Sequence, residues 1–513
     1  MRSPGWALLL LAAAGCSRCG AGSAGAAEEL LPSRPSAAVV TAPLGAVAQH
    51  LAGLIERAGS LPGGEQLGDA RKAIAARLGF DPLTREGLSS AGLDPDRGAA
   101  VALLDRQEWV ASLPLAKPDL FEKAVQTLLV ERGGFAPVGE PAQPTRIFER
   151  RGQRIGVSVV RGYGVLARTA DPGAAIAAAG SRPAEQTLAR DPGLRAARDR
   201  LGGQDFIAWA PAASALAQKT VGRALPGDAA VATTTSAGGT ASRLYVELPA
   251  EDAKRAQATL PGGGAALMEL LPANAPLRAR LGIAPTRLLE SVRSFPEIAA
   301  LLDRLHGADA EVFAALAPGA AVSLGVARDA RIGEAVDYGL DWRRKSPFDT
   351  VQLVALAQVS DRPRLQKAFD QIARLLPELG ARVERSGEDF QVTYAAGRGA
   401  RFGLREIERK PVAYLLGGPL RPEDLRRTPR PANPDTALLY EDAGAALRVD
   451  FGKLAASMRE LPPAAYGSGP QSYVARSLVG QVIEPLRTVR LTLAAEALPD
   501  RMGGVLDVEL VAP

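Results

Sequence analysis

Residues 145–168 read TRIFERRGQRIGVSVVRGYGVLAR, and this stretch decides the fold class. Three short runs rich in β-branched and aromatic residues are separated by two glycine-containing turns: residues 145–149, 154–160 and 163–168, with Arg151-Gly152 and Arg161-Gly162 between them. Consecutive strands joined by such short turns pair in antiparallel order. The stretch therefore predicts an antiparallel meander.

A helix is expected just before this meander. Four apolar residues have the spacing i, i+3, i+4, i+7 that places side chains on one face of a helix: Phe121, Ala124, Val125 and Leu128. Pro118 stands just before them, where a first-turn proline loses no needed hydrogen bond. A meander preceded by a helix favours an α+β fold, with an antiparallel sheet and helices packed mainly on one face.

The same pattern recurs 244 residues further along the chain. The helical stripe returns with a proline before it: Pro363, then Leu365, Ala368, Phe369 and Ile372. Strand-like runs follow it in the same way: residues 382–385, 390–395, 401–407 and 412–416. The chain is therefore expected to consist of two duplicated halves with the same order of elements.

Five short landmarks support the duplication, because they recur in the same order. They are ELLP at 29–32 and 269–272, GAAV at 98–101 and 319–322, VA at 110–111 and 354–355, YGVL at 163–166 and VAYLL at 412–416, and LYVEL at 244–248 and LDVEL at 506–510. We expect a first α+β repeat over residues 37–260 and a second over residues 265–513. The run Pro261-Gly262-Gly263-Gly264 between them is typical of a flexible break.

The amino terminus has the features of an export signal. Residues 1–15 read MRSPGWALLLLAAAG, with a charge at Arg2 and an apolar run that is too short to span a bilayer, which takes roughly 20 residues. Residues 13–16, AAGC, resemble the lipobox of bacterial lipoprotein precursors, although Ala13 stands where leucine is usual. By that resemblance, residues 1–15 are a signal peptide and Cys16 carries the acyl chains.

The resemblance also implies a location. Ser17 follows the cysteine, and in the sorting pattern of such precursors the absence of aspartate there favours the outer membrane. Residues 16–36, rich in Gly, Ala and Ser, are expected to form a flexible tether. The protein would be exported and anchored by its lipid, facing the periplasm or the cell surface.

Two other interpretations of this region stay open. Cleavage after residues 24–26, AGA, would release a soluble periplasmic or secreted protein without any cysteine. Residues 16–19, CSRC, have the C-x-x-C spacing of thiol oxidoreductases, but they lie in a Gly/Ala/Ser tract, and an acylated Cys16 has no thiol to exchange.

The composition leaves little material for several kinds of chemistry. The chain of 513 residues has two His and two Cys, and both cysteines lie before residue 20. We therefore predict no disulfide framework, no metal site and no cofactor. Lys and Arg exceed Asp and Glu by only 5, without a basic patch, so no nucleic-acid partner is expected.

Motifs that resemble functional sites have simpler interpretations. His50 is expected at the edge of a helical stripe and His306 at a helix end. Gly467-Ser468-Gly469 lacks the spacing of a nucleophile elbow. Residues 94–98, DPDRG, lack the later ligands of a calcium loop and predict a turn, and residues 397–403, GRGARFG, predict a hairpin loop. No catalytic residue is predicted.

The body of the chain resembles an exported bacterial family, that of domain of unknown function 3352. The resemblance rests on Leu-Leu-Pro before the first strand, on residues 79–82, GFDP, and 92–95, GLDP, before the GAAV strand, and on residues 187–192, TLARDP, which lead a helix into 206–209, FIAW. It spans most of residues 29–513. It implies an extracytoplasmic setting and brings no catalytic residues.

These observations favour a non-enzymatic lipoprotein of the cell envelope, with a binding or structural role toward an unknown envelope protein. A carrier that holds an apolar ligand in a pocket between sheet and helices is one alternative. An enzyme of unrecognised type, with a cleft of convergent polar groups, is another.

Overall fold

The structure is a computed structural model that describes most of the chain after residue 26. It describes residues 27–512 except 60–63, 105–106, 140–143, 203, 213, 215–224, 237–238, 329, 331–346, 395–396, 431–433, 468–469, 480–482, 484–487 and 499–502. The chain forms two compact units, Met1–Asp252 with Leu498–Val511, and Ala253–Ala497 with Ala512–Pro513. No helix in the described residues is both long and apolar enough to span a membrane.

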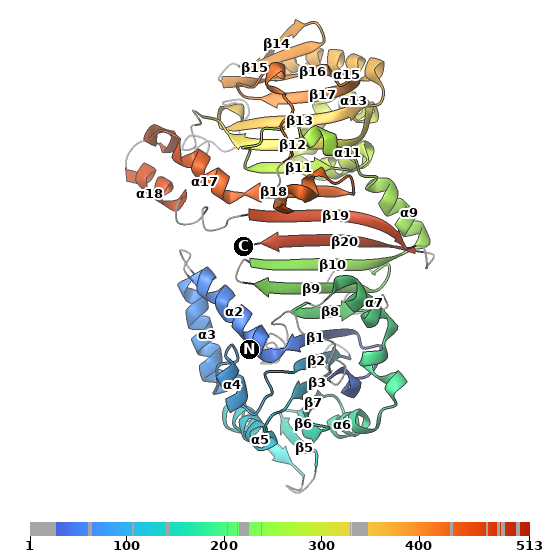
Figure 1. Ribbon diagram of the computed structural model, residues 1–513, viewed down its shortest axis with the longest axis vertical. Coiled ribbons are helices and arrows are strands. Elements are labelled where there is room, and N and C mark those ends of the chain that lie inside the picture. Colours follow the sequence, from blue (N-terminus) through green and yellow to red (C-terminus); the bar gives the residue numbers. More distant parts are fainter. Residues whose placement is uncertain are drawn as a thin grey trace. The chain divides into compact units, whose positions relative to one another are not determined.

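The first unit contains an antiparallel sheet that includes the expected meander (Figure 1). Its strands are β1 (Ala37–Pro43), β2 (Gly98–Leu103), β3 (Trp109–Pro114), β4 (Ala136–Val138), β5 (Arg146–Arg150), β6 (Gln153–Val160), β7 (Tyr163–Arg168), β8 (Phe206–Ala210), β9 (Ala229–Ser236) and β10 (Gly239–Pro249). Their spatial order is β4-β5-β6-β7-β3-β2-β1-β8-β9-β10. The predicted meander is confirmed as β5, β6 and β7.

The second unit repeats this order strand for strand. Its strands are β11 (Leu277–Leu281), β12 (Leu316–Val326), β13 (Val351–Val359), β14 (Ala381–Ser386), β15 (Asp389–Tyr394), β16 (Gly397–Ile407), β17 (Lys410–Gly417), β18 (Ala445–Asp450) and β19 (Thr488–Leu498). Their order is β14-β15-β16-β17-β13-β12-β11-β18-β19. Most of the last strand, β20 (Gly503–Ala512), is grouped with the first unit, where it pairs with β10.

The register of the strands is repeated as well. Val101 on β2 lies opposite Ala111 on β3, and Val322 on β12 lies opposite Ala355 on β13. These are the residues that two of the sequence landmarks matched. The duplicated α+β fold is therefore confirmed at the level of individual pairs across the strands.

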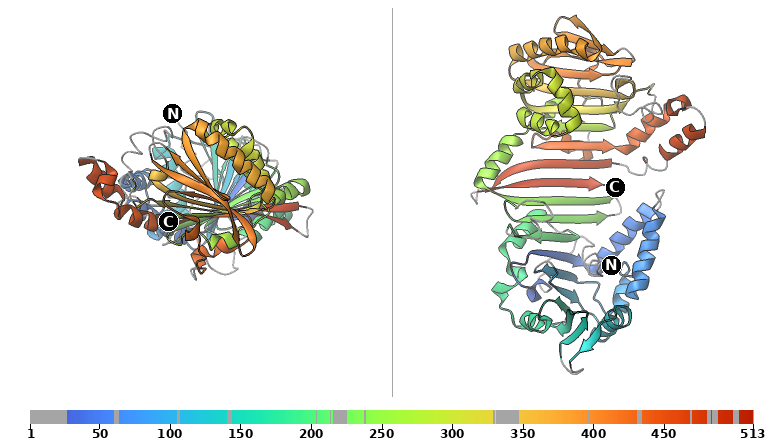
Figure 2. Two further views of the ribbon diagram at one scale, coloured as in Figure 1. Left: turned by 90° about the horizontal axis from the view of Figure 1, so that it is seen from above. Right: turned by 180° about the vertical axis from the view of Figure 1, so that it is seen from behind.

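Helices cover both faces of the first unit's sheet, where mainly one covered face was expected (Figures 1 and 2). One apolar cluster receives side chains from α2 (Leu44–Gly59), α4 (Arg85–Ser90) and α5 (Pro118–Gln126), and a second cluster receives them from α6 (Pro172–Ser181) and α7 (Pro192–Leu201). Strand β2 explains this, because Val101 enters the first cluster and its neighbours Ala100 and Ala102 enter the second. A strand without polar alternation needs cover on both sides.

The predicted helical stripes are confirmed in both units. Phe121 and Val125 of α5 are buried, and so are Leu365 and Phe369 of α15 (Arg362–Leu375). The prolines lie in the first turn of each helix. In the second unit α15 packs over Phe390 and Phe402, while α10 (Ala265–Met268) belongs to the cluster on the other face of the sheet.

The tether predicted for residues 16–36 is wrong from Ala27 onward. A short 3-10 helix, η1 (Glu28–Leu30), begins there, and Leu30 and Leu31 are fully buried in the first unit. Glu28 is buried too, and Arg198 Nη1 donates to its Oε2 at 2.9 Å. Arg198 lies 170 residues from Glu28 in sequence, so the residues near Glu28 give no sign of this contact. Their small and polar side chains alone predicted a tether, although the chain is packed there.

The glycine run predicted as a flexible break is packed inside the second unit. Gly262 N donates to Gly282 O at 3.0 Å, and Gly263 N donates to Asp442 O at 2.9 Å. Gly262 has a φ of 83°, so the chain there follows a path that favours glycine. The glycines serve close backbone packing, and the two compact units divide at Asp252.

Residues 397–403 are also corrected. They were predicted as a hairpin loop, but they form the first part of strand β16 (Gly397–Ile407). Gly399 lies so close to β15 that a Cβ atom there would overlap the carbonyl of Val392. A glycine within a strand marks a close approach of backbones in this case.

We predict that Gly262→Ala destabilises the protein more than Gly307→Ala. Both glycines have nearly the same φ, 83° and 84°, so both alanines adopt a left-handed conformation, at a cost of about 1–2 kcal/mol. A Cβ at Gly262 overlaps Asp442 O, whereas none of the described atoms lies within 4 Å of one at Gly307. Overpacking adds about 1–3 kcal/mol for Gly262→Ala alone. Urea unfolding of the full chain measures both losses, and equal losses would contradict the packed glycine run.

Candidate functional site

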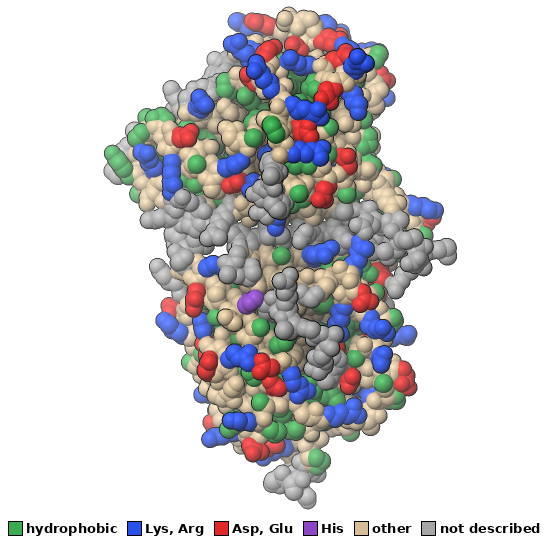
Figure 3. Space-filling model, in the orientation of Figure 1, with side chains coloured by type: hydrophobic (Ala, Val, Ile, Leu, Met, Phe, Trp, Pro, Cys, Tyr) green, Lys and Arg blue, Asp and Glu red, His purple; other side chains and the backbone are tan. Residues whose placement is uncertain are grey.

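Surface charge does not mark a site on the face shown in Figure 3. Lys and Arg side chains are intermingled there with Asp and Glu side chains over the described residues of each unit. Such mixing gives no extended field of one sign. A site on this protein is therefore expected at a concave place or at buried polar groups.

A pocket of about 320 Å³ lies in the first unit. Its lining comes from the segment before β1, the first turn of α7, the end of β8 and the residue before β9: Arg34, Pro35, Ser36, Asp191, Pro192, Gly193, Trp209, Pro211, Ser214 and Asp228. The volume is at the lower end of the range for small-molecule sites, about 300–1,000 Å³. Apolar walls and few polar groups are typical of such sites.

Asp191 builds one side of this pocket. It is the N-cap of α7, with Pro192 in the first turn, and its Oδ1 accepts hydrogen bonds from Gly193 N at 3.0 Å and Leu194 N at 3.4 Å. Its Oδ2 accepts a hydrogen bond from Arg34 N at 3.2 Å. Arg34 has a φ of 55°, a left-handed conformation that is uncommon for a residue with a side chain. Asp191 thus holds the segment before β1 against the helix.

Asp228 supplies a second carboxyl group, and this one is only partly used. Its Oδ1 accepts a hydrogen bond from Ala212 N at 3.0 Å. Burial raises the pKa of Asp228, and the nearby charges of Glu247 and Asp191 raise it further, against the lowering effect of the Ala212 N–H. The Trp209 indole N–H has no hydrogen-bond partner of normal geometry in the described residues, but it lies close enough to lower that pKa slightly.

Gly193 allows this arrangement. A Cβ atom there would overlap Oδ2 of Asp228 and would lie 2.9 Å from the ring of Trp209. Only a residue without a side chain lets the carboxyl group lie against the first turn of α7, where the partial positive charge of the helix terminus favours an anion. Burial and neighbouring acids thus oppose the ionised form, while the helix terminus supports it.

The geometry suits binding better than proton transfer. The oxygens of Asp191 are occupied by three backbone N–H groups, so this carboxyl is a structural cap. Asp228 lines the pocket and makes no ion pair among the described residues. A carboxylate beside an indole and rigid prolines can orient a hydrogen-bond donor on a small molecule.

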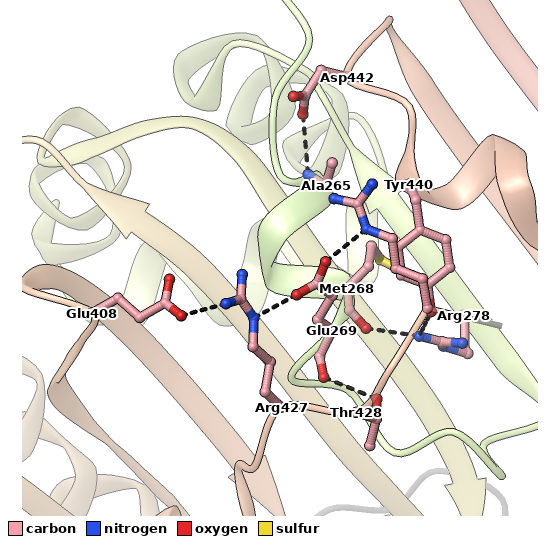
Figure 4. Close-up of polar contacts among 10 residues, drawn as sticks. Ala265, Met268, Glu269, Arg278, Glu408, Arg427, Thr428, Tyr440 and Asp442 are labelled. Carbon is pink, nitrogen blue, oxygen red and sulfur yellow. Dashed lines mark hydrogen bonds and ion pairs between the residues drawn. The ribbon is translucent and has the colours of Figure 1, made fainter.

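In the second unit, the segment that begins with the ELLP landmark at residue 269 is held in place by ion pairs (Figure 4). Glu269, 8% exposed, accepts hydrogen bonds from Arg430 Nε at 2.7 Å and pairs with Arg427 Nε at 2.5 Å. The Arg430 hydrogen bond lowers the pKa of Glu269 below its usual range, and Arg427 adds to this. The landmark ELLP is thus anchored at Glu269, whereas in the first unit the buried acid is Glu28 and Glu29 is exposed.

The residues singled out in the sequence do not meet in this pocket. Cys16, expected to carry the lipid, lies outside the described residues, as does Ser468. His50 contacts the carbonyl of Thr235 from α2, and His306 ends the 3-10 helix Asp303–Leu305 with a φ of 49°. Among the described residues no group of three or more His, Cys, Asp or Glu side chains is placed to hold a metal ion.

Sequence reasoning missed every residue of the pocket. Asp191-Pro192 has the pattern of a helix start, and this pattern alone indicates no pocket. Nothing in the sequence connects it with Arg34, Trp209 or Asp228, because the lining spans nearly 200 positions of the chain. Only the pairing of β1 with β8 and of β8 with β9 brings these segments together.

We predict that Asp228→Asn becomes more stable than the wild type as the pH rises. The raised pKa means that the folded state holds the proton more tightly than the unfolded state. Stability of the wild type therefore falls as the pH rises from about 4, the ordinary value, through the raised value. The amide that replaces the carboxyl group does not titrate, so this loss is absent from the variant.

Urea unfolding of both proteins across this pH range measures the difference. It is expected to be smallest at the acid end and to grow to a plateau at neutral pH. Asp69→Asn, on a side chain that is 78% exposed, serves as the control and should show no such growth. If the difference in free energy of unfolding between Asp228→Asn and the wild type does not change with pH, the pKa of Asp228 is not raised in the folded protein.

The resemblance to the family of domain of unknown function 3352 stays a prediction. Comparisons of this chain with models of protein families, with curated proteins and with solved structures find no match.

Proposed function

We propose that the protein is a non-enzymatic lipoprotein of the cell envelope, anchored at the outer membrane, whose first unit binds a small polar ligand. The pocket beside α7 carries this proposal, because it combines about 320 Å³ of space with a half-buried carboxyl group that faces into it. The ligand would be small, since a pocket of this size holds a molecule of the size of an amino acid rather than a lipid.

The membrane anchor is supported by the sequence alone. Residues 13–16 provide the small residues and the cysteine of a lipobox, and an apolar run precedes them. The described fold begins at Ala27, only 11 residues after Cys16. An acylated Cys16 would therefore hold the first unit, and its pocket, close to the membrane surface.

An apolar ligand is a second candidate, favoured by a smaller hollow in the first unit. This hollow, of about 200 Å³, lies between α5 and strands β5 and β6, and its lining includes Phe121, Val125 and Phe148. It has the position expected for a carrier, between sheet and helices. Its volume is below the usual range of ligand sites, so we place this function second.

Catalysis is a third candidate, and the raised pKa of Asp228 is the observation in its favour. A general acid or base acts together with a second group. That group exchanges another proton with the substrate or holds the reacting group in place. Asp191, the nearest carboxyl group of the lining, is occupied as a helix cap. Binding therefore explains the site with fewer assumptions.

The anchor is tested by replacing Cys16. The native protein is expected to occur in the outer-membrane fraction as a chain that begins at Cys16 and carries acyl mass. Cys16→Ser should remove the acyl mass and abolish this anchoring, whereas Cys19→Ser, three residues away, should change neither. Intact mass spectrometry measures this directly. A native chain that begins at residue 27, or one without acyl mass, would refute the anchor.

Ligand binding is tested by obstructing the pocket. Pro192 is an exposed proline in the first turn of α7, and Pro118 is its counterpart in α5. Small polar molecules that bind the wild type raise its melting temperature, by roughly 5–10 °C at a hundred times Kd. Pro192→Trp should remove this shift, and Pro118→Trp should keep it.

This comparison can also contradict the proposal. If no small polar molecule of a broad collection stabilises the wild type, the first unit does not bind such ligands. If the shift persists unchanged in Pro192→Trp, binding occurs elsewhere on the protein.

A further inference from the structure

Some positions near the pocket of the first unit have equivalents in the second unit that carry different side chains. Ala38 on β1 lies opposite Trp209 on β8, and Arg278 on β11 lies opposite Arg448 on β18. Ala38 also pairs with Ala102 on β2, and Arg278 pairs with Ser323 on β12. These partners each follow the matched residues Val101 and Val322, so Arg278 is the counterpart of Ala38 and Arg448 is the counterpart of Trp209. The second unit therefore has a guanidinium group where the first unit has an indole.

The guanidinium group of Arg448 lies against the counterpart of Asp228. Strands β8 and β9 pair Ala210 with Ala229, and strands β18 and β19 pair Val449 with Val489. Thr488, one residue before Val489, thus corresponds to Asp228, one residue before Ala229. Arg448 Nη2 donates to Thr488 Oγ1 at 3.5 Å, and its Nη1 lies 3.1 Å from Asp450 Oδ2.

A second guanidinium group fills the same region. Arg278, the counterpart of Ala38, is 4% exposed and donates from Nη2 to Met268 O at 2.7 Å and to the Tyr440 hydroxyl at 3.0 Å (Figure 4). Its charge also lies over the ring of Tyr440, 5.7 Å from the centroid. The second unit thus combines a carboxylate, an aromatic ring and cations that belong to the chain itself.

The first unit has the carboxylate and the aromatic ring without a cation that pairs with the carboxylate among the described residues. Asp228 makes no ion pair within the described part of the chain, and Trp209 offers only an uncharged ring with an N–H group. Ala38, in place of Arg278, is fully buried in the apolar cluster that α6 and α7 cover. The pocket is lined by its cross-strand neighbour Trp209 and by Asp228.

We infer that the pocket of the first unit binds an organic cation, with its guanidinium or ammonium group on Asp228 and its apolar part against Trp209 and the prolines. This inference rests on the proposed binding function and names the class of ligand. Charge-assisted hydrogen bonds to a partly buried carboxylate, together with a cation near an indole ring, are the interactions that recognise such ligands.

The charges around Asp228 agree with this ligand. Burial and the nearby acids Glu247 and Asp191 raise its pKa. Arg34 lies at the exposed rim and gives the pocket its one positive side chain among the lining residues. A bound cation would stabilise the ionised carboxylate, so binding should release protons and tighten as the pH rises through the raised pKa.

The test compares ethylguanidinium with ethylurea, a neutral molecule of nearly the same shape, by calorimetry on the full mature chain. Ethylguanidinium should bind at least about tenfold more tightly than ethylurea at pH 8, and its affinity should fall as the pH is lowered. Asp228→Asn should reduce its affinity by about tenfold and remove the pH dependence, whereas Asp69→Asn should change neither.

Each other outcome overturns the inference. Equal affinity for the two probes would show that charge is not recognised, and unchanged affinity in Asp228→Asn would place the cation elsewhere. If only neutral or anionic molecules bind, and Pro192→Trp abolishes their binding, the pocket binds a ligand but not an organic cation. The inference is then wrong, and the proposed binding function stands. If nothing binds in the pocket, both fail together.

Discussion

Strand β2 has no polar side chain on either face, and this single constraint organises the first unit. Its residues GAAVAL are buried from Ala99 to Ala102, so both faces of the sheet must be kept from water. Each large apolar side chain that helices bring onto these faces contributes about 1.5–3 kcal/mol. Cover on the second face is provided by α6 and α7, and the pocket lies where α7 begins, next to the end of that cover.

Local signals were sufficient for the elements and for their duplication. Glycine turns between short apolar runs predicted the β5-β6-β7 meander, and apolar spacing predicted α5 and α15, because these patterns depend only on neighbouring residues. The same local signals gave wrong predictions for the segment around Glu28 and for the run Gly262–Gly264. Their packing depends on Arg198 and Asp442, which lie about 170–180 positions away, and composition carries no information on such partners.

Equivalent positions in the two units have kept their register and changed their chemistry. Arg280 on β11, the counterpart of Val40 on β1, is 1% exposed and binds backbone carbonyls of Ala443 and Gly444 at 2.6 and 2.7 Å. Burial of a charge is costly unless such partners satisfy it. The second unit therefore uses guanidinium groups to hold loops together, at positions where the first unit has buried apolar residues.

The grouping of β20 with the first unit has a consequence for the timing of folding. Residues Leu498–Val511 leave the ribosome after nearly all of the second unit, yet β20 pairs with β10, which is made about 250 residues earlier. Until β20 is made and pairs with it, β10 presents an unpaired edge that can recruit strands of other chains. A chain that stops before β20 keeps that edge exposed, so only molecules that contain β20 hide it. Quality-control proteases would have a simple structural feature by which to recognise copies without this strand.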